Sequence, residues 1–174
     1  MLKDTFKFQT DRLVIRFYQK NDYPKWKRLL SEMKSKQNQW DWEAEDIADL
    51  TPERYQMKLR KHKAERQEGQ VFYFCVEDRS SQELAGIALI TKLEMDNNSV
   101  EIGFQLNNLY WGQGLGTELC KALIAIASSA LKASKSLAEV NPQNKVSMQI
   151  LKKVGFKRMH HSESGRERFL LETN

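Results

Sequence analysis

The stretch from Leu106 to Thr117 carries the residues with the clearest chemical use. It reads Leu-Asn-Asn-Leu-Tyr-Trp-Gly-Gln-Gly-Leu-Gly-Thr and joins a predicted strand to a predicted helix. Glycine lets a backbone approach an anion closely and adopt positive φ angles, and the first amides of a helix point their N–H groups at one place. The spacing therefore predicts a phosphate-binding loop, with a plain tight turn as the alternative.

Two common phosphate-binding motifs fit this loop poorly. A P-loop requires Lys followed by Ser or Thr after its last glycine, whereas Thr117 and Glu118 follow Gly116 here. A dinucleotide-binding fingerprint requires a third glycine where Thr117 stands, although Glu139 is spaced as its ribose-binding acid would be. That fold also usually places its fingerprint near the start of the chain, with more βαβ units behind it than fit after Glu139.

The helices and strands that must position this loop are predicted from two different spacings of apolar residues. Apolar residues at helical spacing predict helices after Asp22, from Thr51 to Gly69, from Thr117 to about Leu131 and from about Asn144. β-rich or alternating runs predict strands near residues 12–18, 71–77, 84–93, 99–106, 136–140, 156–161 and 168–172. The order of these elements predicts an α/β fold with a mixed sheet.

Length and composition indicate one soluble domain over residues 1–174. With 40% apolar and 29% charged residues, the chain is typical of a globular protein. Cys75 and Cys120 lie in apolar runs without metal-ligand spacing, which predicts buried free thiols in a reducing compartment. The first residues lack the apolar core of a signal peptide, and no apolar run reaches the length of a membrane span. We expect a cytoplasmic protein with no membrane partner.

The net charge of +5 is unevenly distributed along the chain. Residues 1–36 hold ten basic and four acidic residues, residues 37–53 hold six acidic and no basic ones, and residues 54–68 hold six basic and two acidic ones. The basic helix at 54–68 allows a nucleic-acid partner, but Tyr55 is its sole aromatic residue. We rank that interpretation lowest and expect no nucleic-acid partner.

Three motifs together resemble the GCN5-related N-acetyltransferases (GNAT), in the branch that includes enzymes acetylating the N-termini of ribosomal proteins. Thr10–Arg16 is similar to the first strand of that branch. Glu101–Phe104 followed by Trp111–Glu118 resembles its strand and acetyl-CoA loop, and Asn141–Phe156 resembles its last helix and the start of the next strand. The resemblance spans nearly the whole chain, except residues 35–70.

The resemblance implies a GNAT-like sheet of six to seven mostly antiparallel strands flanked by about four helices. It also implies acetyl-CoA as cosubstrate, its pantetheine arm lying in a gap between the strand before the loop and the strand after the long helix. The residues that it assigns to acetyl-CoA are the backbone of Phe104 and Leu106, the loop residues Trp111, Gly112, Gln113, Gly114, Leu115, Gly116 and Thr117, and Asn144. Lys145 is either a further contact to a CoA phosphate or a solvated lysine.

Acetyl transfer requires the amine to attack the thioester without its extra proton. An α-amine has a pKa of about 8 and a lysine amine of about 10.4, so a general base is useful, as is an acid for the departing thiolate. Ser147 falls where the family often places the acid, and its alternative role is a polar residue on an exposed helix face. Glu101 is the candidate base, because it lies opposite the apolar side of its strand; the alternative is a solvent-facing glutamate.

In this fold the acceptor usually meets the first two helices and their connection. Here the connection is acidic and carries Trp40, Asp41, Trp42 and Glu43, which would suit a cationic amine through cation–π contact and charge steering. The alternative is a solvated acidic segment whose tryptophans anchor in the core. His62, His160 and His161 form no spaced ligand set with carboxylates, so we expect surface histidines and no metal.

The resemblance therefore implies an acetyl-CoA-dependent N-acetyltransferase whose acceptor is a primary amine, foremost the α-amine of a protein or peptide N-terminus. The alternatives are a small-molecule acetyltransferase of the same fold, acting on an aminoglycoside or a polyamine, and a CoA-binding module without catalysis. The oligomeric state, monomer or homodimer, stays open.

Overall fold

The computed structural model describes residues 2–93, 98–159 and 165–173, which form an eight-stranded sheet in the order β1-β2-β3-β4-β5-β6-β8-β7. The strands are β1 (Lys7–Gln9), β2 (Leu13–Arg16), β3 (Val71–Asp78), β4 (Leu84–Lys92), β5 (Ser99–Leu106), β6 (Lys135–Val140), β7 (Lys157–Arg158) and β8 (Glu167–Glu172). Neighbours pair antiparallel, except that β5 and β6 are parallel. The mixed, mostly antiparallel sheet is confirmed, and the short edge strand β1 makes it larger than the six to seven strands predicted.

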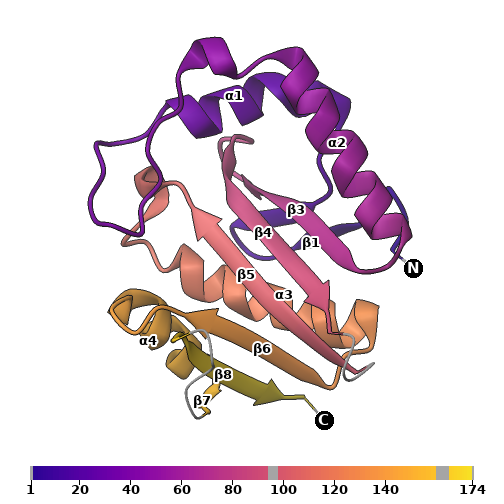
Figure 1. The fold of residues 1–174 in the computed structure, drawn as a ribbon, viewed down its shortest axis with the longest axis vertical. Coiled ribbons are helices and arrows are strands. Elements are labelled where there is room, and N and C mark those ends of the chain that lie inside the picture. Colours follow the sequence, from indigo (N-terminus) through magenta and orange to yellow (C-terminus); the bar gives the residue numbers. More distant parts are fainter. Residues whose placement is uncertain (1, 94–97, 160–164, 174) are drawn as a thin grey trace.

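Helices lie on both faces of this sheet. They are α1 (Tyr23–Ser31), α2 (Pro52–Gln67), α3 (Leu115–Leu131) and α4 (Lys145–Lys153), with short 3-10 turns η1 (Lys20–Asp22), η2 (Ile47–Asp49) and η3 (Asn108–Tyr110). Figure 1 shows α1 and α2 on one face and α3 and α4 on the other. Thr51 caps α2 by accepting a hydrogen bond from the N–H of Arg54. In the described part of the chain, no helix combines the length and apolarity needed to cross a membrane.

Asp22 occupies the N-cap position of α1, but its carboxylate forms no capping hydrogen bond to that helix. It is buried and accepts hydrogen bonds from the Arg16 guanidinium at 2.6 and 2.8 Å and from the N–H of Gln19 at 2.8 Å. The ion pair therefore ties the start of α1 to the end of β2.

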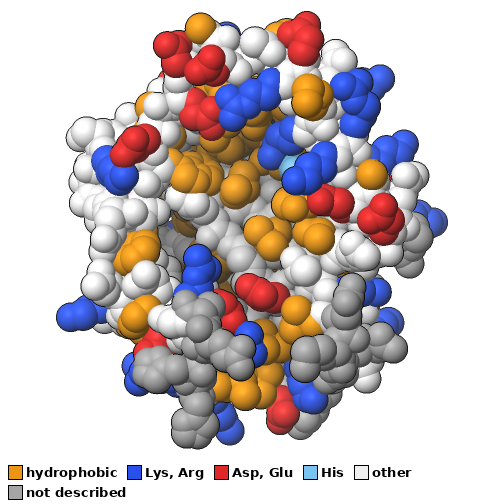
Figure 2. Space-filling model, in the orientation of Figure 1, with side chains coloured by type: hydrophobic (Ala, Val, Ile, Leu, Met, Phe, Trp, Pro, Cys, Tyr) orange, Lys and Arg blue, Asp and Glu red, His pale blue; other side chains and the backbone are white. Residues whose placement is uncertain are grey.

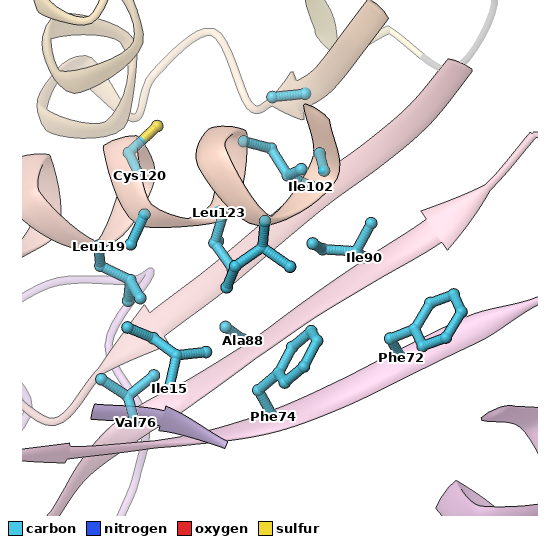
Figure 3. Packing of buried hydrophobic residues seen from close by; sticks show 14 of the residues in the cluster. Ile15, Phe72, Phe74, Val76, Ala88, Ile90, Ile102, Leu119, Cys120 and Leu123 are labelled. Atoms are coloured by element: carbon cyan, nitrogen blue, oxygen red, sulfur yellow. The ribbon is translucent and has the colours of Figure 1, made fainter. Parts of the chain in front are cut away.

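Alternating side chains along the central strands fill two cores. On one face, Leu119 and Leu123 of α3 pack over the sheet, as Figure 3 shows, against a cluster that includes Ile15, Phe72, Phe74, Val76, Ala88, Ile90 and Ile102. On the other face, Cys75 packs with Trp26 and Leu29 of α1 and Tyr55 of α2. Both cysteines are buried free thiols, as predicted.

The helices α1 and α2 leave part of their face of the sheet uncovered. Figure 2 shows a hollow in the middle of this face, with acidic and basic side chains on its rims. The even-numbered residues Val100, Ile102 and Leu106 of β5 belong to the core under α3. Since side chains alternate along a strand, the odd-numbered residues Glu101 and Gly103 face the hollow side.

Candidate active site

β5 and β6 separate partway along their length. Their parallel pairing runs from Ser99 to Glu101 of β5 and ends at Leu137 of β6. Beyond that point β6 continues along β8 to Val140, whereas β5 continues along β4 to Leu106. The gap that the resemblance implies is therefore present between the carboxyl ends of these two strands.

The backbone of β5 presents free groups to this gap. Asn107 donates its N–H to the carbonyl of Ala85 in β4 at 2.9 Å, and hydrogen-bonding direction alternates along an antiparallel strand. The N–H and C=O groups of Phe104 and Leu106 consequently point away from β4, toward the gap. The indole N–H of Trp111 donates to the Leu106 carbonyl at 2.9 Å, which leaves both backbone groups of Phe104 for a ligand that adds like a strand.

The glycine-rich loop gives α3 an N-terminus without a side-chain cap. Gly112 and Gly114 both have φ of 77°, in the left-handed region that favours glycine, and Gly114 occupies the N-cap position. The N–H of Thr117 donates to the Gly114 carbonyl at 3.1 Å, so the amides before Thr117 are those that a phosphate would use. A Cβ on Gly116 would lie 3.0 Å from Ile150 of α4, and glycine therefore lets α3 and α4 approach closely.

Arg12 and Thr10, from the turn before β2, hold this loop from the side. The Arg12 guanidinium donates to the Gln113 carbonyl at 2.8 Å and to the Glu118 carboxylate at 2.7 Å, and the Thr10 hydroxyl donates to the same carboxylate at 2.6 Å. Burial opposes ionisation of Glu118, but the hydrogen bonds from Thr10 and Arg12 outweigh it and lower the pKa of Glu118. Sequence reasoning placed Thr10 and Arg12 in a first strand and missed this role.

Asn144 and Ser147 lie at the start of α4, which follows β6 after a short loop. The side-chain oxygen of Asn144 accepts the N–H of Ser147 at 3.1 Å, so Asn144 caps the helix while its amide nitrogen remains a possible donor. Ser147 is half-buried in the first turn, and Lys145 beside it is exposed. The helix start thus lies on the β6 side of the gap, opposite the free edge of β5.

Glu101 occupies the last paired position before β5 and β6 separate. Burial raises the pKa of its half-buried carboxyl, and the nearby Glu139 raises it further, while Arg168 and Arg166 lower it. A carboxylate whose pKa is raised is a stronger base than an ordinary glutamate and is better suited to accept a proton. The structure therefore brings the predicted base to the point where the gap opens.

The segment between α1 and η2, residues 32–46, reaches both sides of the gap. Three consecutive residues of this segment form hydrogen bonds to three different elements. The side chain of Gln39 bonds to Gln143 in the loop before α4 at 3.0 Å. The backbone carbonyl of Trp40 bonds to Gln105 of β5 at 3.3 Å, and the carboxylate of Asp41 bonds to Asn108 of η3 at 2.8 Å. The acidic connection that we expected near the acceptor therefore lies against the end of β5.

The four predicted acceptor residues differ in their surroundings. Asp41 is only 7% exposed, and its carboxylate accepts hydrogen bonds from the N–H of Gln37 and the amide of Asn108. Asp41 therefore stabilises the fold of the segment and its contact with η3. Glu43 is exposed and forms an ion pair with a lysine of the same segment. Trp40 and Trp42 are half-buried, and Trp42 packs against the core under α1 and α2.

The adjacent residues Asn107 and Asn108 belong to the predicted phosphate-binding loop, which gives neither of them a role of its own, yet both are buried. Asn107 donates to the carbonyls of Leu29 and Glu32 at the end of α1. Asn108 exchanges hydrogen bonds with the backbone of Lys34 at 2.8 Å. These two amides connect the end of β5 to the acceptor segment.

His62 is not the surface histidine that we predicted. Its ring stacks on Tyr73 with centres 4.0 Å apart, and burial, together with the neighbouring Lys58, lowers its pKa to about 3. His160 and His161 lie outside the described residues. Within residues 2–93, 98–159 and 165–173, no group of three or more His, Cys, Asp or Glu side chains is arranged to hold a metal ion.

Comparison with curated proteins finds acetyltransferases. The ribosomal protein uS5-alanine N-acetyltransferase of Escherichia coli (strain K12) is 24% identical over 150 residues, which cover 86% of this chain and 77% of that protein. An uncharacterized N-acetyltransferase, p20, of Bacillus licheniformis is 28% identical over 91 residues, 52% of this chain. The chain spans about half the length of the curated Bacillus relatives that it matches, 51% and 55%.

The fold and the family agree with these relatives. The solved structure of Mycobacterium smegmatis RimJ in complex with CoA-disulfide has a TM-score of 0.71 at 18% identity, covering 91% of this chain and 79% of that one. The family model of the Acetyltransferase (GNAT) domain matches residues 12–157, from the arginine that holds the glycine loop to the strand after α4. The chain belongs to the GNAT acetyltransferase family.

Proposed function

We propose that this acetyltransferase transfers the acetyl group of acetyl-CoA to the α-amine of a protein or peptide N-terminus. The observation that carries the proposal is the gap between β5 and β6, which has a free strand edge on one side and the uncapped start of α3 at its end. The relative named as a ribosomal-protein alanine N-acetyltransferase supports this class of acceptor.

The residues around the gap fit acetyl-CoA, which would supply the acetyl group as a thioester. The backbone of Phe104 would bond the pantetheine arm as an added strand does. The loop amides from Gln113 to Gly116 would bind the pyrophosphate, helped by the positive end of the α3 dipole. The free amide nitrogen of Asn144 would donate to the arm from the opposite side.

The chemistry that these residues support is direct attack of the amine on the thioester. Glu101 would take the proton from the acceptor ammonium, directly or through water. The amine nitrogen then bonds to the carbonyl carbon as the carbon–sulfur bond breaks, and the hydroxyl of Ser147 would donate a proton to the departing sulfur. The second proton that the nitrogen loses as it becomes an amide would restore the Ser147 hydroxyl, directly or through water. Backbone amides next to the carbonyl oxygen would stabilise its growing negative charge.

Release of free thiol from acetyl-CoA tests the proposal, measured against N-terminal peptides, polyamines and aminoglycosides. We expect turnover with peptides, and a lower kcat for Ser147→Ala with little change in the KM for acetyl-CoA. Ser129→Ala is a matched control, because its hydroxyl bonds to the Ala125 carbonyl within α3. Turnover only with polyamines or aminoglycosides would indicate a small-molecule enzyme, and CoA binding without any thiol release would indicate a module without catalysis.

A further inference from the structure

Lys58 of α2 is a half-buried cation without an ion pair among the described residues. Two other basic side chains with little exposure have carboxylate partners: Arg16 pairs with Asp22, and Arg66 pairs with Asp4. The Lys58 ammonium instead lies 4.5 Å from the centre of the Tyr18 ring. Burial lowers its pKa to about 8. Lys58 is thus a partly dehydrated cation that pairs with no carboxylate among the described residues, since the nearby Glu45, whose charge raises the pKa of Lys58, forms its ion pair with Arg54.

Two polar atoms near Lys58 are also unsatisfied. The hydroxyl of Tyr18 and Nδ1 of His62 are buried and have no hydrogen-bond partner in the part of the chain that the structure describes. The two rings lie 5.8 Å apart. Buried polar groups are almost always hydrogen-bonded, so this cluster of Tyr18, Lys58 and His62 indicates a place for a ligand. Because Lys58 and the Tyr18 hydroxyl can both donate, the ligand that suits the cluster is an anion.

Tyr73 connects this cluster to the proposed reaction centre. His62 stacks on Tyr73, which pairs with Leu89 of β4, and Leu89 pairs with Gly103 of β5. Since neighbouring strands are about 4.8 Å apart, Tyr73 and Gly103 are separated by roughly 10 Å. Glu101 lies two residues from Gly103 on the same face of β5. Figure 2 shows basic side chains gathered at the rim of the hollow beside α2.

We infer that the cluster of Tyr18, Lys58 and His62 binds an acidic side chain at the third residue of the acceptor peptide, an inference that rests on the proposed N-terminal acetylation. An extended peptide advances about 3.3 Å per residue. With its α-amine at Glu101, its third residue lies about 7 Å along the peptide, and an extended glutamate side chain at that residue spans the remaining distance to the cluster. The carboxylate would accept hydrogen bonds from the Lys58 ammonium and from the Tyr18 hydroxyl once it reaches that group.

Two peptides that differ only in carrying Glu or Gln at residue three test this inference. For each protein, kcat/KM for the Glu peptide is divided by kcat/KM for the Gln peptide. We expect a ratio of about five to ten for the wild type, the size of one hydrogen bond of ordinary net strength. The ratio should fall to about one in Lys58→Met, or in Lys58→Gln if the first variant does not fold. Lys61→Met is the matched control, since this exposed lysine precedes His62 on the same helix, and it should keep the wild-type ratio.

Equilibrium binding of the same peptides in the presence of CoA makes the comparison without turnover. The Glu peptide should bind about five to ten times more tightly than the Gln peptide to the wild type and to Lys61→Met. Equal affinities, or a preference for Glu that survives in Lys58→Met, would overturn the inference even if both peptides are acetylated. A preference for Glu that depends on Lys58, found without any thiol release, would support the anion site and overturn the proposed function instead.

Discussion

Arg12 illustrates how a single side chain can set the shape of an anion-binding loop. Its guanidinium bonds to the carbonyl of Gln113 and to the carboxylate of Glu118, one on each side of the start of α3. The side chain is 48% exposed, and one of its nitrogens would lie 3.7 Å from a Cβ on Gly114. Arg12 is therefore a positioning residue for the loop amides.

Replacing Arg12 by Met should weaken acetyl-CoA binding more than it slows chemistry. The loop loses two charge-assisted hydrogen bonds, so we expect the KM for acetyl-CoA to rise about fivefold to tenfold with kcat nearly unchanged. Arg28→Met is the control, because Arg28 forms an exposed ion pair with Glu83 outside the loop. A fall in kcat without any change in this KM would contradict the positioning role.

The raised pKa of Glu101 predicts where acetyl transfer fails on acidification. Glu101 can accept a proton only as a carboxylate, so the rate should fall as the pH drops through its pKa. Because burial and Glu139 raise that pKa, the fall should begin at a higher pH than for an ordinary glutamate. The pH dependence of kcat/KM should lose this acidic limb in Glu101→Gln.

Glu139, whose charge acts on Glu101, provides the matched comparison. Replacing Glu139 by Gln removes one of the charges that raises the pKa of Glu101, so the acidic limb should move to lower pH. An acidic limb that stays in place in Glu101→Gln would exclude Glu101 as the general base.

At the scale of elements, the gap depends on how closely β4 approaches β5. A Cβ on Gly86 of β4 would lie 2.3 Å from the backbone oxygen of Gln105, a distance that no side chain tolerates. A Cβ on Gly103 would meet only Leu89 of β4, at an ordinary 3.6 Å. A side chain at Gly86 would therefore require β4 and β5 to move apart, whereas a side chain at Gly103 would not.

Gly86→Ala should displace the end of β5 and destabilise the protein by about 1–3 kcal/mol. Since the end of β5 borders the gap, the KM for acetyl-CoA should rise as well. Gly103→Ala is the matched control and should unfold at or slightly above the wild-type temperature, because alanine orders a strand more easily than glycine. Thermal unfolding measures the stability of both variants, and initial rates measure their KM for acetyl-CoA. Equal stability of the two variants would refute the close approach of β4 to β5 at Gly86.

Elements with a strong local pattern could be predicted from the sequence, whereas their long-range connections could not. Thr51-Pro52 marks the start of α2, and the alternation around Glu101 marks β5. The edge strand β1 was missed because three residues, two of them polar, carry no detectable period. The glycine-rich loop could be predicted because its glycines and the helix that follows them are neighbours in the sequence. Asn108 and Asp41 are 67 residues apart, and a single sequence gives no sign that they meet.

At the scale of the whole molecule, the alternating charge blocks of the sequence pair with each other. Glu43 of the acidic segment forms an ion pair with Lys36 before it, and Glu45 forms one with Arg54 after it. Two of the carboxylates that we expected to steer a cationic acceptor are therefore partly neutralised within the protein. The half of the chain that holds the gap is nearly neutral, so anion binding there depends on backbone amides and the start of α3.

His62 makes the stability of the whole molecule sensitive to mild acid. Its pKa falls from 6.5 to about 3 in the folded protein, so below pH 6.5 the unfolded chain binds a proton that the folded chain does not. The free energy of unfolding should therefore decrease as the pH falls from 7 to 5, with a share from His62 of up to about 1 kcal/mol after allowance for its partial exposure. His62→Phe keeps an aromatic ring beside Tyr73 but cannot titrate, and it should lose this share. Urea unfolding at pH 7, 6 and 5 measures the free energy of unfolding of the wild type and of His62→Phe. The contributions of the histidines that both proteins share cancel in the difference. Identical pH dependence in the two proteins would show that His62 is not held neutral.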